Sequence, residues 1–254
     1  MHPRFPLPLL AGLLVASAAL VATPVSAAAS VRIAGASVSA TPQPGDPLPA
    51  CRYADVKTRY RKTADWQHIL VDTERKESRA YVPPDLVSVA RANIAGSGRV
   101  RALLIDDLKA MAAAAQQAGA GIAVRSAYRS YANQAATFQG WVDRDGYQAA
   151  LLASARPGHS EHQLGTAIDF RSANSTRAPW DYPDWAITAA GAWMQENAWQ
   201  YGFLMSYPKG KFSAVCYEYE PWHYRYFGRA LAAQIHNSHQ TTRRYLWKHF
   251  ETAP

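Results

Sequence analysis

Residues 160–169 read SEHQLGTAID, and they constrain the path of the chain more than any other segment. His162 and Asp169 are both residue types that ligate zinc. Seven residues of extended strand would separate them by about 23 Å, so the chain must turn between them if both contact one ion. Gly165 permits such a turn because it has no Cβ. An apolar pair then carries Asp169 into surroundings where a carboxylate needs a partner, and a cation would serve. Taken alone, the segment also fits a surface histidine and an aspartate that caps a turn or helix.

The sequence Glu220-Pro221-Trp222-His223 adds an acid three residues before a histidine. Zinc hydrolases need three protein ligands, an open position for water, and a carboxylate that takes a proton from that water. His162, Asp169 and His223 would supply the ligands, and Glu220 would supply the base. Because proline is poorly tolerated in a central ladder, we expect this motif at a strand end or edge. The alternative is an ordinary aromatic core strand, which explains the flanking aromatic residues but not the acid and the histidine.

A third segment, SAYRSYANQ at residues 126–134, follows a short apolar run and precedes a helical pattern. Ser130 is a candidate N-cap for that helix. Arg129 stands at the corner, where its guanidinium could reach a carboxylate or a developing oxyanion. Gln134 lies about one turn into the helix. In isolation, these residues equally fit a solvated arginine and a capping serine.

Together the three segments resemble the VanY-type D-alanyl-D-alanine carboxypeptidases, a branch of the zinc peptidases. The shared pattern is SxHxxGxAxD, a later ExWH and an upstream YRSxxxQ, and all three occur here in order. The resemblance covers roughly residues 80–230. It implies one Zn²⁺ ion and the following site residues: metal ligands His162, Asp169 and His223, catalytic residues Glu220 and Arg129, and substrate contacts Arg129, Gln134 and Ser160. The motif assigns no role to His159, which we expect at most to contact the metal ligands from behind without binding the metal. It also assigns no role to the nearby acids Glu161 and Glu218.

The function that the resemblance implies is hydrolysis of the terminal D-Ala-D-Ala bond of peptidoglycan stem peptides. The same motifs also serve L,D-carboxypeptidases, and endopeptidases such as phage lysins use a related fold, so both remain alternatives. A zinc-containing wall-binding module without turnover is a further one, although such a module needs no base and Glu220 is intact. Nucleic acid is not expected as a partner because the basic residues form no run, and the net charge of +8 suits an anionic wall polymer equally well.

Hydrophobic periodicity predicts an α+β fold with a small antiparallel sheet flanked by helices, and the resemblance implies a hedgehog/D-Ala-D-Ala-peptidase-like fold. Helices are expected at 102–118, 131–142, 147–153, 185–199, 227–235 and 243–250. Strands are expected at 121–126, 165–170, 203–207 and 215–219, with a turn at 208–210 between the last two. In this prediction the helices come first and the strands cluster late.

The N-terminus predicts export. Residues 1–27 combine Arg4, an uncharged apolar run and small residues at 25–27, which is typical of a signal peptide. An uncleaved membrane anchor is the alternative, and it would be the only membrane attachment. Residues 28–50 are expected to be a Pro/Ala/Ser-rich linker and residues 51–254 the catalytic domain. In a periplasm or cell-wall space, the only two cysteines, Cys51 and Cys216, favour an intrachain disulfide over two free thiols.

Overall fold

The computed structural model describes residues 47–252, so the expected signal peptide and most of the expected linker lie outside the described residues. A five-stranded sheet organises this part of the chain. Its strand order is β4 (Ala95–Gly96), β6 (Ile122–Ser126), β7 (Ala167–Ser172), β9 (His223–Tyr226) and β8 (Phe203–Met205). The pairing is antiparallel except between β4 and β6, which run parallel. The predicted α+β class is confirmed.

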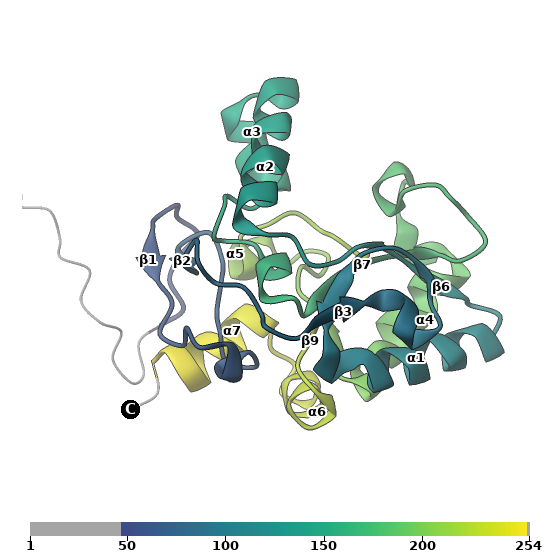
Figure 1. The fold of residues 1–254 in the computed structure, drawn as a ribbon. Helices are drawn as coiled ribbons and strands as arrows, with labels where there is room; N and C mark the ends of the chain where they lie inside the picture. The colour runs from purple at the N-terminus through teal and green to yellow at the C-terminus, as the bar shows by residue number, and fades with distance from the viewer. Residues whose placement is uncertain (1–46, 253–254) are drawn as a thin grey trace, which may run out of the picture. The chain divides into compact units, whose positions relative to one another are not determined.

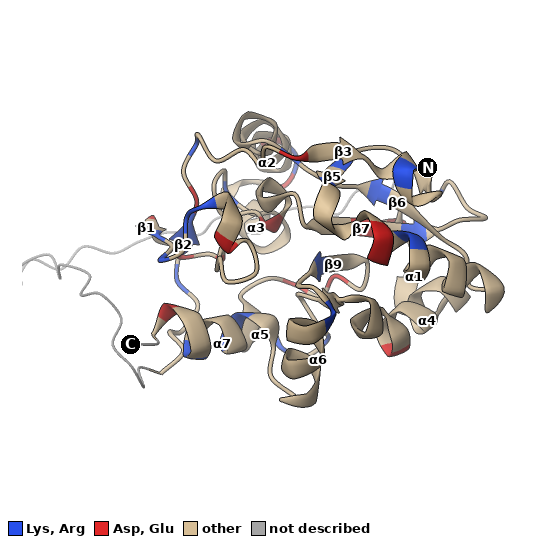
Figure 2. Ribbon diagram, turned by 60° about the horizontal axis from the view of Figure 1, so that its bottom comes forward, with Lys and Arg blue, Asp and Glu red and all other residues tan. Residues whose placement is uncertain are grey.

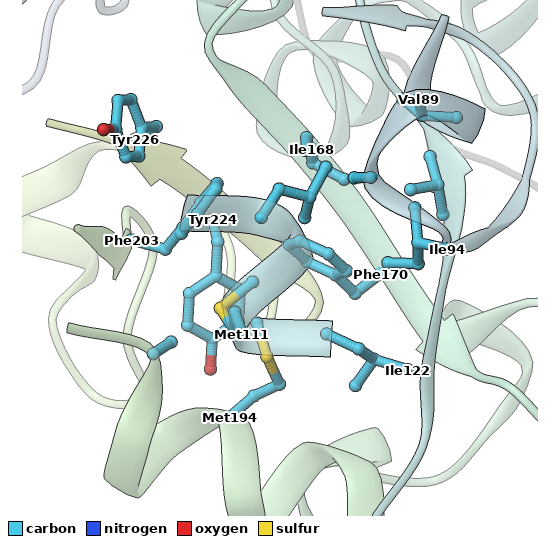
Figure 3. Packing of buried hydrophobic residues seen from close by; sticks show 14 of the residues in the cluster. Val89, Ile94, Met111, Ile122, Ile168, Phe170, Met194, Phe203, Tyr224 and Tyr226 are labelled. Carbon is cyan, nitrogen blue, oxygen red and sulfur yellow. The ribbon is translucent and has the colours of Figure 1, made fainter. Parts of the chain in front are cut away.

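Two helices cover one face of the sheet: α1 (Ile105–Gln117) contacts β6, and α4 (Ala189–Asn197) contacts β7 (Figure 1). Figure 3 shows why this face is apolar: Met111 of α1 and Met194 of α4 lie among strand residues such as Phe170 and Tyr224. Phe170 and Tyr224 are each at most 1% exposed. Because side chains alternate across a strand, their neighbours in sequence, Asp169 and His223, point to the opposite face.

The remaining elements surround this sheet. Two small sheets are formed by segments before α1: β1 (Val56–Lys57) pairs with β2 (Arg75–Lys76), and β3 (Leu86–Ser88) pairs with β5 (Arg99–Arg101). The hairpin of α2 (Tyr131–Asp145) and α3 (Tyr147–Ala153) projects from the sheet in Figure 1 and has its own small apolar cluster. The C-terminal part contains α5 (Phe212–Val215), α6 (Arg229–Asn237) and α7 (Thr242–Leu246), followed by a π-helical turn at Trp247–Glu251.

Several sequence predictions are confirmed closely, notably α2, α3 and β6. Ser130 is the N-cap of α2, since its hydroxyl accepts a hydrogen bond from the Asn133 amide at 3.2 Å. The helix expected at 185–199 is divided, because Thr188 caps α4 separately from a preceding 3₁₀ turn. Thr188 accepts a hydrogen bond from the Gly191 amide at 3.1 Å.

Two predictions are wrong. Residues 215–219 do not form a strand: α5 ends at Val215, and Cys216 has a left-handed backbone with a φ of 68°. The partner of β8 is instead β9, which begins at His223. The strands also do not cluster late, because within the described residues five strands of two or three residues precede α1, and such short strands leave no periodic signal.

The basic residues lie on several separate elements, including β2, β5, β6 and β9 (Figure 2). Within residues 47–252, no helix combines the length and the apolar character needed to cross a membrane.

Candidate active site and metal centre

Three side chains from separate parts of the chain converge at the face of the sheet opposite α1 and α4. His162 comes from the 3₁₀ turn Glu161–Leu164, Asp169 from β7 and His223 from β9. Asp169 and His223 are directly paired across the two strands. One potential ligand atom from each of the three lies within 4.8 Å of the others, and all three residues are buried.

The local sequence explains how His162 reaches Asp169. The Ser160 hydroxyl accepts a hydrogen bond from the His162 amide at 3.3 Å, which starts the 3₁₀ turn. Gly165 ends it with a left-handed φ of 71°. A Cβ at Gly165 would lie 3.0 Å from side-chain atoms of both Arg101 and Leu86, so a larger residue has neither the backbone freedom nor the room. The turn expected at Gly165 is therefore confirmed.

Hydrogen bonds behind the two imidazoles fix which ring nitrogen faces the centre. His162 Nδ1 lies 2.8 Å from the carbonyl oxygen of Ala127, so it carries a proton, and Nε2 is directed to Asp169 Oδ2 at 3.2 Å. His223 is turned the other way: Nδ1 lies 3.0 Å from Asp169 Oδ1, and Nε2 lies 2.9 Å from Glu161 Oε2. Two imidazole nitrogens and one carboxylate oxygen form the donor set of catalytic zinc sites, so the residues fit this metal.

The buried charges shift one another's pKa. Burial opposes ionisation of Asp169, but the attraction and hydrogen bonds of His162 and His223 outweigh it and hold the pKa of this carboxyl below its usual range. Burial likewise disfavours a charged His223, yet its hydrogen bonds to Asp169 and Glu161 raise the pKa to about 10. Burial lowers the pKa of His162. The cluster thus pairs an anionic Asp169 with a positively charged His223, while burial favours the neutral form of His162.

Glu220 precedes β9 and lies beside this cluster, with Oε2 3.8 Å from His223 Nδ1. Its amide donates to the Tyr207 carbonyl at 3.1 Å, and its own carbonyl accepts from the His223 amide at 3.1 Å, so its backbone is held at both ends. Burial raises the pKa of Glu220 to about 8, against the opposing charge of His223. The motif lies at a strand end, as expected from Pro221, although β9 itself is an inner strand.

Arg129 approaches the cluster from the corner between β6 and α2. Its Nη2 lies 3.8 Å from Asp169 Oδ2 and donates to Ser126 Oγ at 3.2 Å, while Nη1 donates to Gln134 Oε1 at 2.8 Å. Gln134 is fully buried, and its Nε2 donates to the Ala155 carbonyl at 2.6 Å. The amide of Gln134 is therefore bonded at both ends, and it orients the guanidinium of Arg129.

These groups line one pocket with a volume of 430 Å³. All of the predicted site residues border it: Arg129, Gln134, Ser160, His162, Asp169, Glu220 and His223. Six aromatic side chains contribute to its walls: Trp141, Trp180, Tyr207, Tyr217, Tyr219 and Trp222. An apolar pocket with a few convergent polar groups is the usual form of a small-ligand site.

Glu161 is the residue of the site that sequence reasoning missed. It is 5% exposed, and its carboxylate contacts His223, Ser206 and Arg225. Its place between Ser160 and His162 was the available signal, but chain position does not show what lies behind a residue in space. His159, by contrast, bonds to Asp72 and Asp55 and does not contact the cluster.

Comparisons with known proteins identify the family to which the chain is similar. The family model described as "VanY: D-alanyl-D-alanine carboxypeptidase" matches residues 98–229. The putative carboxypeptidase YodJ of Bacillus subtilis is 40% identical over 149 residues, which are 59% of this chain and 54% of that protein. A D-alanyl-D-alanine carboxypeptidase of Enterococcus faecium is 33% identical over 125 residues, covering 48% of this chain and 35% of that one. The chain thus spans about half the length of these curated relatives, or less.

Solved structures share the fold. The LdcB LD-carboxypeptidase has a TM-score of 0.62 and 36% identity, over 70% of this chain and 85% of that one. A single-residue mutant of the vancomycin resistance D,D-pentapeptidase VanY, in complex with Zn(II), has a TM-score of 0.60 and 27% identity, over 71% of this chain and 99% of that one. The family match covers more than half of the chain and includes every predicted site residue. The chain therefore belongs to the VanY family of D-alanyl-D-alanine carboxypeptidases.

Proposed function

We propose that this protein is a zinc-dependent carboxypeptidase that removes the terminal D-alanine from peptidoglycan stem peptides ending in D-Ala-D-Ala. The observation that carries the proposal is the convergence of three ligand atoms, within 4.8 Å of one another, with Glu220 and Arg129 in one pocket. A binding module would need the three ligands but not a carboxylate beside them.

The ligands of a single zinc ion would be His162 Nε2, a carboxylate oxygen of Asp169 and His223 Nδ1, which are the atoms that face one another. When bound, zinc supplies a Lewis acid that polarises a carbonyl and lowers the pKa of water to about 7. Support comes from the donor set and from the similar VanY structure, which is a complex with Zn(II).

Glu220 would move the proton. Its carboxylate accepts a proton from the attacking water and then donates it to the nitrogen of the departing D-alanine. The burial that raises its pKa to about 8 suits this role, because a group that takes and releases a proton works best when its pKa is near the working pH.

Arg129 would bind negative charge on the substrate. Its guanidinium presents planar donors toward Asp169 and the pocket, and Gln134 and Ser126 hold it in place. It can pair with the terminal carboxylate of the peptide or with the oxyanion that develops at the attacked carbonyl. Ser160, which also borders the pocket, would contact the substrate.

An L,D-carboxypeptidase is the second candidate, in which the residue before the removed D-alanine has L configuration at its reacting centre. It is favoured by the similarity to the LD-carboxypeptidase LdcB, whose identity to this chain, 36%, exceeds the 27% of VanY. The catalytic groups are the same in both candidates, so the choice concerns the substrate and not the chemistry.

We also propose that the enzyme acts outside the cytoplasm. The signal-like residues 1–27 support this, as does the Cys51–Cys216 disulfide, because disulfides persist mainly in oxidising compartments. Stem peptides of the wall would be accessible there.

Mass spectrometry of defined stem peptides tests the proposal. The zinc-loaded protein is incubated separately with a pentapeptide ending in D-Ala-D-Ala and with the corresponding tetrapeptide, and a metal-stripped sample is the control. Loss of one alanine from the pentapeptide alone supports the D,D specificity. Loss from the tetrapeptide alone selects the L,D candidate, and two intact peptides contradict a carboxypeptidase.

A further inference from the structure

We propose that Glu161 is a positioning residue that holds His223 with Nδ1 toward the metal centre. The inference rests on the zinc-binding part of the proposed function and does not depend on which peptide is cleaved. Glu161 does not border the pocket, so it acts through His223 and not on the substrate.

The contact is direct. Glu161 Oε2 lies 2.9 Å from His223 Nε2, on the side of the ring away from Asp169. A cation between Asp169 and His223 requires a free electron pair on Nδ1, so the remaining ring proton must be on Nε2. An ionised carboxylate only accepts hydrogen bonds, and Glu161 is therefore a matched partner for that proton. Such outer carboxylates orient metal-binding histidines and strengthen their binding.

Glu161 is itself fixed by donors on both oxygens. Oε2 also accepts from the Ser206 hydroxyl at 2.6 Å, and Oε1 accepts from Arg225 Nη1 at 3.2 Å. Arg225 is fully buried, and its Nη2 donates to the carbonyls of Trp66 and Ile69 at 2.9 and 2.8 Å. Only a carboxylate presents acceptors in both directions. The amide of a glutamine would direct its NH₂ group either at Arg225 or at Ser206 and His223, all of which are donors here.

The two histidine ligands differ in how they are held. His162 Nδ1 faces a backbone carbonyl, that of Ala127, which no substitution removes. His223 Nε2 faces a side chain, so the hydrogen bond behind this ligand depends on one replaceable residue. A change at Glu161 should therefore weaken one ligand selectively and leave the other two, and the base Glu220, in place.

Zinc affinity of Glu161→Gln, measured by competition with a chromogenic chelator, tests the inference. We expect an affinity about 10–100-fold below that of the parent. Thermal unfolding of the metal-free proteins is measured in parallel. The matched control is Glu251→Gln, which makes the same change at an acid that is 2% exposed and accepts from Thr58 and Arg59, away from the pocket. This control should keep the parent's zinc affinity, whatever its effect on the unfolding temperature.

Ser206→Ala is the second variant, in case Glu161→Gln does not fold. It removes one donor to Oε2 and leaves Glu161, Arg225 and His223 unchanged, so we expect a smaller, few-fold loss of affinity. Parental affinity in Glu161→Gln, or in Ser206→Ala where Glu161→Gln does not fold, would overturn the inference and leave Glu161 a purely structural residue. A parent that binds no zinc would overturn both proposals, whereas a parent that binds zinc but cleaves no stem peptide overturns only the function.

Discussion

Three side chains, those of Gln134, Ser126 and Asp169, hold Arg129 beside the candidate zinc ligands. The shape of its guanidinium should therefore matter as much as its charge. We predict that Arg129→Lys lowers kcat/KM by about 10²–10³, the typical effect of removing one preorganised donor to an oxyanion. Lysine keeps the charge but lacks the planar two-donor fork, so the contacts with Gln134 and the substrate cannot both form. Steady-state kinetics on a D-Ala-D-Ala-terminated peptide measure the effect.

The kinetic constants also identify what Arg129 contacts. A fall in kcat indicates contact with the transition state, whereas a higher KM at constant kcat indicates uniform binding of the substrate terminus. Zinc content should equal that of the parent, because Arg129 is not a ligand. A variant with near-parental kcat/KM would show that Arg129 only stabilises the corner between β6 and α2.

Glu77 should make stability depend on pH. It is 2% exposed, its Oε1 has no hydrogen-bond partner among the described residues, and burial raises the pKa to about 7. Between about pH 4.5 and pH 7 the folded protein keeps a proton that the unfolded chain has lost. The free energy of unfolding therefore falls as the pH rises through this window, by up to about 3 kcal/mol, since one pKa unit corresponds to about 1.4 kcal/mol.

We predict that Glu77→Gln removes this dependence. The variant should match the parent near pH 4 and exceed its stability near pH 8, where the parent has a buried anion and the variant a neutral amide. Denaturant unfolding at the two pH values gives the comparison, and Glu196→Gln, a change at an exposed acid, is the control. Equal slopes of stability against pH in the parent and Glu77→Gln would contradict the assignment.

At the scale of elements, the sequence could predict the strands and helices whose patterns are long or chemically distinctive. The strand predicted at 165–170 is recognisable because apolar residues flank a single acid, Asp169, and it corresponds to β7 in the structure. The alternation of apolar and other residues at 215–219 led to a strand prediction that the structure contradicts. Val215 and Tyr217 are buried, but Tyr217 packs against Tyr207 in the pocket wall at a ring distance of 5.0 Å, not in a ladder. Burial of alternate residues therefore does not by itself imply a strand.

The Cys51–Cys216 disulfide connects the start of the described chain to the segment that leads to Glu220. The Cα atoms are 5.3 Å apart, and the bond closes a loop with a sequence separation of 165. The predicted pairing is confirmed, but Cys216 follows α5 and is not on a strand. Hydrogen bonds connect the same two segments, because Arg243 Nη1 donates to the carbonyl of Pro49, near Cys51, and to that of Ala214, near Cys216.

We predict that replacing both cysteines with serine lowers the free energy of unfolding by about 2–5 kcal/mol, with the upper end from the loop-closure entropy of so long a loop. Zinc affinity should stay near the parental value, because the three ligands lie on β7, β9 and the 3₁₀ turn at 161–164. Urea unfolding with and without reductant provides the measurement. An unchanged midpoint after reduction would show that the bond contributes no stability.

Across the whole molecule, the candidate site was more predictable than the fold. His162, Asp169, Glu220 and His223 are chemically distinctive and occur at motif spacing, so the sequence indicates which four side chains the fold brings together. Glu161 was not predictable, because its role depends on β9 lying beside the 3₁₀ turn. The short strands before α1 were missed for a similar reason, since tertiary contacts and not local pattern define them.

If three residues hold zinc while Glu220 acts as the base without being a ligand, zinc binding and cleavage should separate when Glu220 is replaced but not when a ligand is replaced. The most direct measurement determines bound zinc and pentapeptide cleavage on the same samples of the parent, Glu220→Ala and His223→Ala. We predict that Glu220→Ala keeps one zinc per chain and loses cleavage by about 10²–10⁴-fold, while His223→Ala loses both zinc and cleavage. Loss of zinc from Glu220→Ala comparable to that in His223→Ala, or near-parental cleavage by a zinc-loaded Glu220→Ala, would contradict it.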